Sequence, residues 1–307
     1  MIVALSGGIG GAKLALGLSR VLPAGELTVI ANVGDDFEHL GLAISPDIDT
    51  LTYTLAGLDN PDLGWGRRDE TWSFMATLAA LGGPTWFRLG DRDLALHMER
   101  TRRLASGESL SAITQDFGRR LGAAARILPA TDDKVRTRLN TSEGWMDFQP
   151  WFVGRRAEPA VTELAFVNAD RAWANPDVLT ALAEAEAIVI CPSNPFISIE
   201  PMLAIPAIEA ALRATRAPIV AVAPIIGGRA VKGPTVKMMG ELGMEPSARA
   251  VAELYDGLLG VYVADEADAG TLDGLGCRVV LAPTLMTTLA DKEVLARVVL
   301  RAAAEAR

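Results

Sequence analysis

The chain has 307 residues, half of them hydrophobic and 22% charged, so it can bury a large core and shows no sign of general disorder. Its 29 basic and 38 acidic side chains give a formal net charge of −9, which argues against a broad nucleic-acid surface, because phosphate binding needs a basic face. Two cysteines and two histidines are too few for a disulfide framework or a multi-histidine site, so any metal would sit mainly on carboxylate and carbonyl oxygens, which favours magnesium or calcium.

The N-terminus starts with a short apolar run that enters a glycine-rich turn, without the basic region of a signal peptide. The longest apolar run, residues 217–228, spans 12 residues and contains two prolines, so no membrane span is predicted. We therefore expect a cytoplasmic protein.

Short apolar runs alternate with helical patterns along most of the chain. This alternation predicts βαβ units, an α/β fold and a largely parallel, buried sheet. We expect strands at residues 2–5, 27–31, 164–167, 187–191, 219–223, 259–263 and 279–281, and helices at 12–21, 178–186, 207–215, 248–255 and 291–304.

The segment from about residue 71 to residue 126 breaks this rhythm. Successive helical patterns at 71–81, 93–105 and 109–121 predict a helical insertion over about residues 64–127, within a single α/β domain that covers residues 1–307. The irregular stretch 136–161 carries four aromatic residues and suggests a hairpin or an aromatic flap.

The first chemical signal is the turn Ser6-Gly7-Gly8-Ile9-Gly10-Gly11-Ala12-Lys13, which follows a strand and opens a helix. Glycines let the backbone approach an anion, and the free N–H groups of the helix start favour negative charge. The turn lacks the third glycine of a dinucleotide fingerprint, since Lys13 stands there, and it does not match a P-loop. We favour a phosphate site over a tight turn without a ligand.

The second signal is a polar loop, residues 32–49, that is rich in aspartate. Loops that follow adjacent strands of an open α/β sheet meet at its carboxyl edge, where ligands bind. Carboxylates gathered beside a phosphate site would repel one another unless a hard cation lay between them. Asp35 and Asp47 taken singly are as well explained as helix caps or solvated residues, but the cluster favours a metal.

Three further segments follow at intervals. In RLGDRDLALH (88–97), Asp91 or Asp93 can cap a helix, and His97 lies one turn beyond Asp93. In CPSNPF (191–196), polar groups follow a strand directly. In PIIGGRAVKGP (224–234), Arg229 and Lys232 can clamp a diphosphate, although a mobile surface turn explains the loop as well.

Taken together, these motifs resemble the 2-phospho-L-lactate transferase family (CofD) of coenzyme F-420 biosynthesis, in its bacterial branch. The motifs that carry the resemblance occur in the family's order: GGIGGAK (7–13), NVGDD (32–36), SPDIDT (45–50), LGDRD (89–93), LPATDD (128–133), PSNP (192–195) and PIIGG (224–228). The resemblance implies a Rossmann-like three-layer fold, a homodimer and a requirement for magnesium. It also implies transfer of a phosphorylated three-carbon acid from a guanosine diphosphate conjugate to 7,8-didemethyl-8-hydroxy-5-deazariboflavin, with release of GMP.

The resemblance also assigns roles to individual residues. Asp49 and Arg88 would bind the deazaflavin, Asp36 and Asp49 would hold the metal, and Asp49 is our candidate to accept the proton of the attacking hydroxyl. We place Asp91 and His97 at the substrate site as well. The remaining expectations are nucleotide contacts from Gly7, Gly8, Gly10, Gly11, Lys13, Ser193, Asn194, Gly227 and Gly228, and stacking on the deazaflavin by Trp65, Trp72 and Trp86, for which a structural role is the alternative.

Two other classes stay open. An NAD(P)-dependent oxidoreductase is favoured only by the glycine turn and lacks an acidic residue at Asn32, after the second strand. A non-catalytic nucleotide or sugar-nucleotide-binding regulator of the same fold would not need the aspartate motifs. Among donors we expect the phosphoenolpyruvate conjugate first and the 2-phospho-L-lactate conjugate second, while a glyceryl donor is the third possibility.

Overall fold

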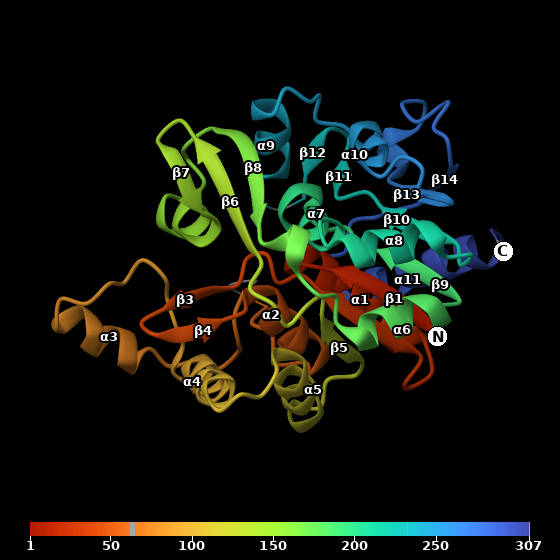
Figure 1. Ribbon diagram of the computed structural model, residues 1–307. Coiled ribbons are helices and arrows are strands. Elements are labelled where there is room, and N and C mark those ends of the chain that lie inside the picture. Colours follow the sequence, from red (N-terminus) through yellow and green to blue (C-terminus); the bar gives the residue numbers. More distant parts are fainter. Residues whose placement is uncertain (62–64, 232, 307) are drawn as a thin grey trace.

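Seven parallel strands form the central sheet of the protein (Figure 1), as the computed structural model shows for residues 1–61, 65–231 and 233–306. Their order is β14-β13-β10-β9-β1-β2-β5. The strand order therefore reverses between β1 and β9: β2 and β5 follow on one side of β1, and the later strands β9 to β14 lie on the other side. The predicted α/β class with a parallel sheet is therefore confirmed. The strands are β1 (Ile2–Ser6), β2 (Leu27–Ala31), β5 (Arg126–Pro129), β9 (Ala187–Ile190), β10 (Ile219–Val222), β13 (Val261–Ala264) and β14 (Arg278–Leu281).

Helices cover both faces of this sheet and make a three-layer fold. Successive strand residues point to opposite faces, so Val3 and Leu5 face one layer while Ile2 and Ala4 face the other. One layer contains α1 (Gly8–Val21), α2 (Pro46–Leu55) and α11 (Leu289–Ala304); the other contains α6 (Pro176–Glu184), α7 (Glu200–Leu203), α8 (Pro206–Ala214), α9 (Thr235–Glu241) and α10 (Ala248–Leu254).

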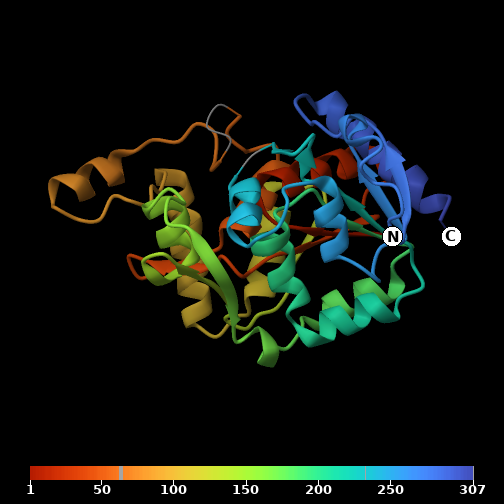
Figure 2. The ribbon, with the colours of Figure 1, turned by 90° about the horizontal axis from the view of Figure 1, so that it is seen from above.

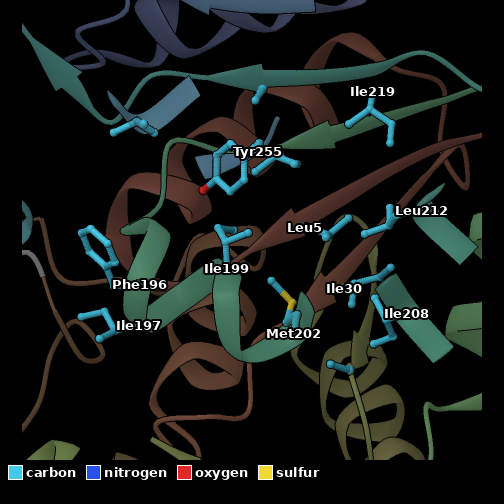
Figure 3. Packing of buried hydrophobic residues seen from close by; sticks show 14 of the residues in the cluster. Leu5, Ile30, Phe196, Ile197, Ile199, Met202, Ile208, Leu212, Ile219 and Tyr255 are labelled. Atoms are coloured by element: carbon cyan, nitrogen blue, oxygen red, sulfur yellow. The ribbon is translucent and has the colours of Figure 1, made fainter. Parts of the chain in front are cut away.

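The second layer packs through branched and aromatic side chains. Leu5 and Ile30 from the sheet lie against Met202 and Ile208 from the helices, as Figure 3 shows. Short helical turns, η1 (Pro150–Gly154), η2 (Ala169–Arg171), η3 (Pro195–Ile199) and η4 (Glu266–Asp268), connect the regular elements. η3 follows β9 and places its start at the carboxyl edge of the sheet.

Three small antiparallel sheets lie outside the central one. They are the hairpin β3 (Phe37–His39) with β4 (Leu42–Ile44), the sheet β7-β6-β8 (Gly144–Asp147, Arg136–Thr141, Val161–Val167), and the hairpin β11 (Ile225–Ile226) with β12 (Arg229–Ala230). The expected hairpin within 136–161 is present as β6 and β7. The strand expected at 164–167 exists as β8, but it pairs with β6 and not with the parallel sheet.

In the segment after β2, one expectation was wrong and one strand was missed. The stretch 32–49 is not one polar loop, because it contains the β3–β4 hairpin and the first turn of α2. β5 was not expected as a strand, and it pairs with β2 at the edge of the sheet.

Three helices, α3 (Ser73–Ala80), α4 (Asp91–Ala105) and α5 (Leu110–Leu121), separate α2 from β5, at the positions expected for the insertion. α3 projects from the body of the molecule (Figure 2). Glu70 accepts hydrogen bonds from the N–H groups of Arg92 and Asp93 at the start of α4, and Asp91 accepts those of Ser73 and Phe74 at the start of α3. The expected boundary at residue 64 lies outside the described residues, as does Lys232.

Among the described residues, no single helix has the length and hydropathy to cross a bilayer. The pair Pro195–Leu203 and Pro206–Ala214 meets these criteria only when combined, and it is bent by 86°.

Candidate functional site

A cavity of about 610 Å³ opens at the carboxyl edge of the sheet, next to the point between β1 and β9 where the strand order reverses. This is where open α/β sheets bind ligands. The turn after β1, the loop after β9 and the segment after β10 all contribute to its wall, with Lys13, Asn194 and Thr235 among the residues. Residues as far apart as Gly7 and Met286 therefore meet at one site.

The glycines of the first turn allow its close packing. A Cβ on Gly10 would lie well inside van der Waals distance of the Pro192 carbonyl oxygen, and one on Gly11 would collide with the Ser6 and Ser193 hydroxyls. Gly8 has a φ of +64°, which favours glycine. Gly7 and Gly8 line the cavity, and so does Gly10, whereas Gly11 is turned toward the protein interior.

The N–H of Gly8, at the start of α1, already has a partner within the protein. Gly8 N donates to Asp47 Oδ1 at 2.5 Å, and Asn32 Nδ2 donates to Asp47 Oδ2 at 2.9 Å. Burial raises the pKa of Asp47 to about 6, although both hydrogen bonds lower it. A phosphate bound at this helix start would have to share or displace the Asp47 carboxylate.

Asp35 and Asp36 lie beside this carboxylate. Burial, with Asp47 and Asp36 nearby, raises the pKa of Asp35 well above its usual range. Burial raises the pKa of Asp36 to about 7 against the opposing charges of Arg136 and Arg100, and Ser45 donates its hydroxyl to Asp36 Oδ2 at 2.9 Å. Asp35 lines the cavity, whereas Asp36 lies behind its wall.

Asp49 lines the cavity from the first turn of α2 and forms an ion pair with the buried Arg100 of α4. His97, also on the wall, has Nδ1 at 3.6 Å from Asp49 Oδ2 and Nε2 at 3.3 Å from Asp93 Oδ2. Tyr53 donates its hydroxyl to Asp93 Oδ1 at 2.6 Å. Two predicted site residues, Asp49 and His97, are thus brought together.

Aromatic side chains form another part of the wall. Trp65 and Trp86 line the cavity, together with Phe148 and Phe152, which are stacked with ring centroids 5.2 Å apart. Arg88 also lines the cavity, and its guanidinium lies 4.1 Å from the ring centroid of Trp72, which itself is not on the wall. Such surfaces suit a flat aromatic ligand.

Ser193 and Asn194 line the cavity, but both have bonds within the protein. Ser193 Oγ accepts from Gly7 N at 3.2 Å and donates to Gly7 O at 2.8 Å, which joins the loops after β1 and β9. Asn194 Oδ1 accepts from Phe196 N at 2.9 Å and caps η3. Lys13 Nζ donates to Met286 O at 3.0 Å.

Besides Gly11, Asp36 and Trp72, three more predicted residues, Asp91, Gly227 and Gly228, do not lie on the described cavity wall. Gly227 and Gly228, with φ of +53° and +73°, form the two-residue turn of the β11–β12 hairpin, a geometry that glycine favours. Asp91 holds the start of α3, and its pKa is lowered by the hydrogen bonds from Thr71 and the backbone. Their binding roles stay predictions.

The wall residues Asp35, Asp47 and Asp93 were considered as members of an acidic cluster or as helix caps but received no site role of their own, and Tyr53 was not considered. Tyr53 had a readable signal, because it follows Asp49 by four residues and therefore shares its helix face. Arg100 had none, since it stands in a run of charged residues typical of a solvated helix.

The carboxylates fit a hard divalent cation by their chemistry. Oδ1 of Asp35 and Oδ1 of Asp36 are buried and have no hydrogen-bond partner among the described residues. Asp36 is close enough to Asp49 for its pKa to be affected by that charge. A second group of possible ligands consists of Asp49, Asp93 and His97, whose ligand atoms lie within 4.8 Å of one another.

Comparisons with known proteins give a consistent result. A family model described as 2-phospho-L-lactate transferase CofD matches residues 2–279. The chain is 41% identical over 317 residues to a protein of Streptomyces griseus named phosphoenolpyruvate transferase, with 100% of this chain and 99% of the relative covered. Proteins of the same name are 43% identical in Kitasatospora aureofaciens (100% and 98% covered) and 39% identical in Mycolicibacterium smegmatis (93% of each).

Among solved structures, a UPF0052 family protein from Bacillus halodurans matches with a TM-score of 0.64 at 15% identity, covering 97% of this chain and 98% of the other. This similarity concerns the fold.

Proposed function

The chain belongs to the CofD family of 2-phospho-L-lactate transferases, and from this membership we propose that it moves a phosphorylated three-carbon acid from a guanosine diphosphate conjugate to a deazaflavin. The acceptor would be 7,8-didemethyl-8-hydroxy-5-deazariboflavin, and GMP would leave. Membership in the family supports a transferase of coenzyme F-420 biosynthesis. The proposal also specifies the donor, the acceptor, magnesium as the metal and a homodimer.

The observation that carries the proposal is the composition of the cavity. One side is the carboxyl edge of the sheet, with the glycine turn and buried carboxylates, and other parts of the wall are aromatic. A nucleotide diphosphate suits the former and a flat tricyclic ring suits the latter. Both reactants can therefore meet in one cavity.

The reaction needs alignment and charge neutralisation more than an unusual nucleophile. The terminal hydroxyl oxygen of the acceptor forms a bond to the phosphorus that carries the acid, while the bond from that phosphorus to GMP breaks. We assign Asp49 to accept the hydroxyl proton, which its position on the cavity wall supports. Arg88, which also lines the cavity, would hold the acceptor through an anionic or carbonyl oxygen of the ring.

Magnesium completes the proposal, with Asp36 and Asp49 as its ligands. When bound, it supplies positive charge for the diphosphate. The buried Oδ1 of Asp36, without a hydrogen-bond partner among the described residues, supports this assignment. Asp35, whose Oδ1 has the same property and which lies on the cavity wall, is a third candidate ligand.

For the donor we propose the phosphoenolpyruvate conjugate. Its support is the name phosphoenolpyruvate transferase of the relatives, which are about 40% identical over most of their length. Lactyl, enolpyruvyl and glyceryl donors differ in a small acid group, and such differences are worth about 1–3 kcal/mol unless a buried polar group is left unpaired.

A competition assay tests the proposal. The purified protein receives the three donors at equal concentration with magnesium and the deazaflavin, and mass spectrometry identifies the product. We expect the enolpyruvyl product to dominate. A dominant lactyl or glyceryl product would overturn only the choice of donor. If no donor supports transfer, and NAD(H) or a sugar nucleotide raises the thermal unfolding midpoint instead, the proposed transferase reaction is wrong.

Two variants serve as controls. Asp49→Asn removes a carboxylate from the cavity wall and is expected to be inactive. Asp177→Asn removes a carboxylate that pairs with Arg126 at the surface, and it is expected to be as active as the original protein.

A further inference from the structure

Arg100 is a buried cation beside the cavity that the reaction as described does not use. Its side chain is only 1% exposed, although it lies on α4 among arginines that face solvent or the neighbouring helix. Arg103, three residues later, pairs with Glu108 at 2.6 Å and Asp116 at 2.7 Å, away from the cavity. Because burying a guanidinium is costly unless it is paired, the partners of Arg100 indicate its purpose.

The first partner is Asp49. Nη1 of Arg100 donates to Asp49 Oδ2 at 3.1 Å, and Nη2 donates to Oδ1 of the same carboxylate. Nη1 also donates to the carbonyl oxygen of Ala43 at 3.3 Å, at the hairpin strand β4. Two parallel N–H bonds from a planar group fix the plane of a carboxylate as well as its position.

The second partner is His97. Nη1 of Arg100 lies 3.3 Å from His97 Nδ1. A guanidinium can only donate, so Nδ1 must accept, and the proton of a neutral ring is then on Nε2. Nε2 lies 3.3 Å from Asp93 Oδ2 without hydrogen-bond geometry, so only the contact with Arg100 bears on the position of the proton. The tautomer of the histidine therefore follows from its arginine neighbour.

We propose that Arg100 is a positioning residue of the transferase, which fixes the Asp49 carboxylate at the cavity wall and holds His97 as the tautomer with its proton on Nε2. This inference rests on the proposed function, in which Asp49 faces the acceptor hydroxyl. Arg100 does not itself line the cavity, so it acts through these two neighbours.

Arginine and lysine carry the same charge but differ in hydrogen-bond geometry, so substitutions at position 100 can separate the effect of charge from that of positioning. A lysine at position 100 would supply positive charge to Asp49 but not two parallel donors, and a glutamine would supply neither the charge nor the fork. We therefore make Arg100→Gln and Arg100→Lys, with Arg103→Gln as the matched control. The control removes an arginine with two carboxylate partners from the same helix, outside the cavity.

The first measurement is steady-state transfer with each variant, together with its thermal unfolding midpoint. We expect Arg100→Gln to lower kcat about 100-fold, because a misplaced reacting group can have an effect of that size, and to change the donor KM less than threefold. Arg100→Lys should recover part of the rate and carries the test if Arg100→Gln is insoluble. Arg103→Gln should keep kcat within twofold of the original protein, even if its thermal unfolding midpoint falls as far as that of Arg100→Gln.

A kcat of Arg100→Gln, or of Arg100→Lys in its place, within threefold of the original protein would overturn the proposal. An equal kcat loss in Arg103→Gln would also overturn it, since that would mean a general loss of structure. If the unchanged protein neither transfers to the deazaflavin nor binds it, the proposed function fails, and this assignment fails with it. An active protein with an unaffected Arg100 variant refutes the positioning role alone.

The second measurement asks whether Arg100 acts through Asp49. Deazaflavin affinity is measured by fluorescence polarisation without donor or magnesium, for Arg100→Gln, Asp49→Asn and the double variant. We expect Arg100→Gln to weaken binding about 10-fold in the original background and less than twofold in the Asp49→Asn background, because the two changes remove one interaction. A 10-fold loss in both backgrounds would refute action through Asp49.

Discussion

Replacing Gly10 by alanine is expected to destabilise the protein and to weaken guanine-nucleotide binding. A Cβ at this position would have to retreat by about 1 Å from the Pro192 carbonyl oxygen to reach ordinary van der Waals contact. Overpacking of this kind costs about 1–3 kcal/mol, while alanine gains at most about 1 kcal/mol over glycine in a helix. The net loss should be about 1–2 kcal/mol.

Two other helical glycines separate the packing effect from the effect on the site. A Cβ on Gly17, also in α1 but not on the cavity wall, would collide with the carbonyl of Lys292 in α11. A Cβ on Gly240, in α9, would meet nothing within 4 Å. Gly17→Ala should therefore lose as much stability as Gly10→Ala, and Gly240→Ala should gain up to about 1 kcal/mol.

The assay is urea unfolding followed by circular dichroism, with GDP binding measured by calorimetry on the same samples. Only Gly10→Ala should weaken GDP binding, by about 10-fold, because its clash moves the first turn of α1 away from the loop after β9. The reasoning is refuted if Gly10→Ala is as stable as the original protein. It is also refuted if Gly17→Ala weakens GDP binding equally.

The remaining predictions concern single side chains. Asp49→Asn should reduce turnover by orders of magnitude with the fold intact by circular dichroism, and normal turnover at limiting magnesium would exclude a ligand role. Arg88→Ala should weaken deazaflavin binding more than guanine-nucleotide binding in separate titrations, and equal losses would indicate a structural role. Thr288→Ala removes half of the capping box with Asp291 at the start of α11 and should lower the free energy of unfolding by about 1 kcal/mol in a urea titration. Burial raises the pKa of folded Asp36 to about 7, so the folded state retains a proton that the unfolded state has released. The free energy of unfolding in magnesium-free buffer should therefore fall as the pH rises from about 4 to about 7, and an unchanged slope in Asp36→Asn would contradict this.

The parallel sheet could be predicted because its strands are continuous apolar runs between helical patterns. β1 and the glycine turn into α1 are the best example, since the apolar run, the glycines and the helical spacing agree. β5 escaped prediction because it has four residues, starts with an arginine and ends with a proline. Its place as an edge strand depends on pairing with β2, a contact between distant segments.

The candidate site could be located from the sequence, but the partners of its residues could not be deduced. The acidic motifs indicated the edge of the sheet at which the cavity lies, yet Asp47 proved to bond to Gly8, and the pairing of Asp49 with Arg100 spans 51 residues. Gly227 and Gly228 were assigned to nucleotide binding because they belong to a glycine-rich loop with two cations and to a motif of the family. Their position between two short strands was also a hairpin signal, and the structure shows that hairpin.

The residues that form the cavity wall are far apart in the sequence, and this separation affects how the chain folds. β1 pairs with β9, 185 residues later in register, and Lys13 reaches the carbonyl of Met286. Contacts of such long range slow folding, because a large loop must close before the contact stabilises it. During synthesis, β1 and β2 emerge long before β9, so their apolar faces and the unpaired edge of β1 stay exposed until β9 has been made. A truncated chain that lacks the last strands and α11 would be expected to aggregate and would have no substrate cavity, since that cavity is complete only when nearly the whole chain is present.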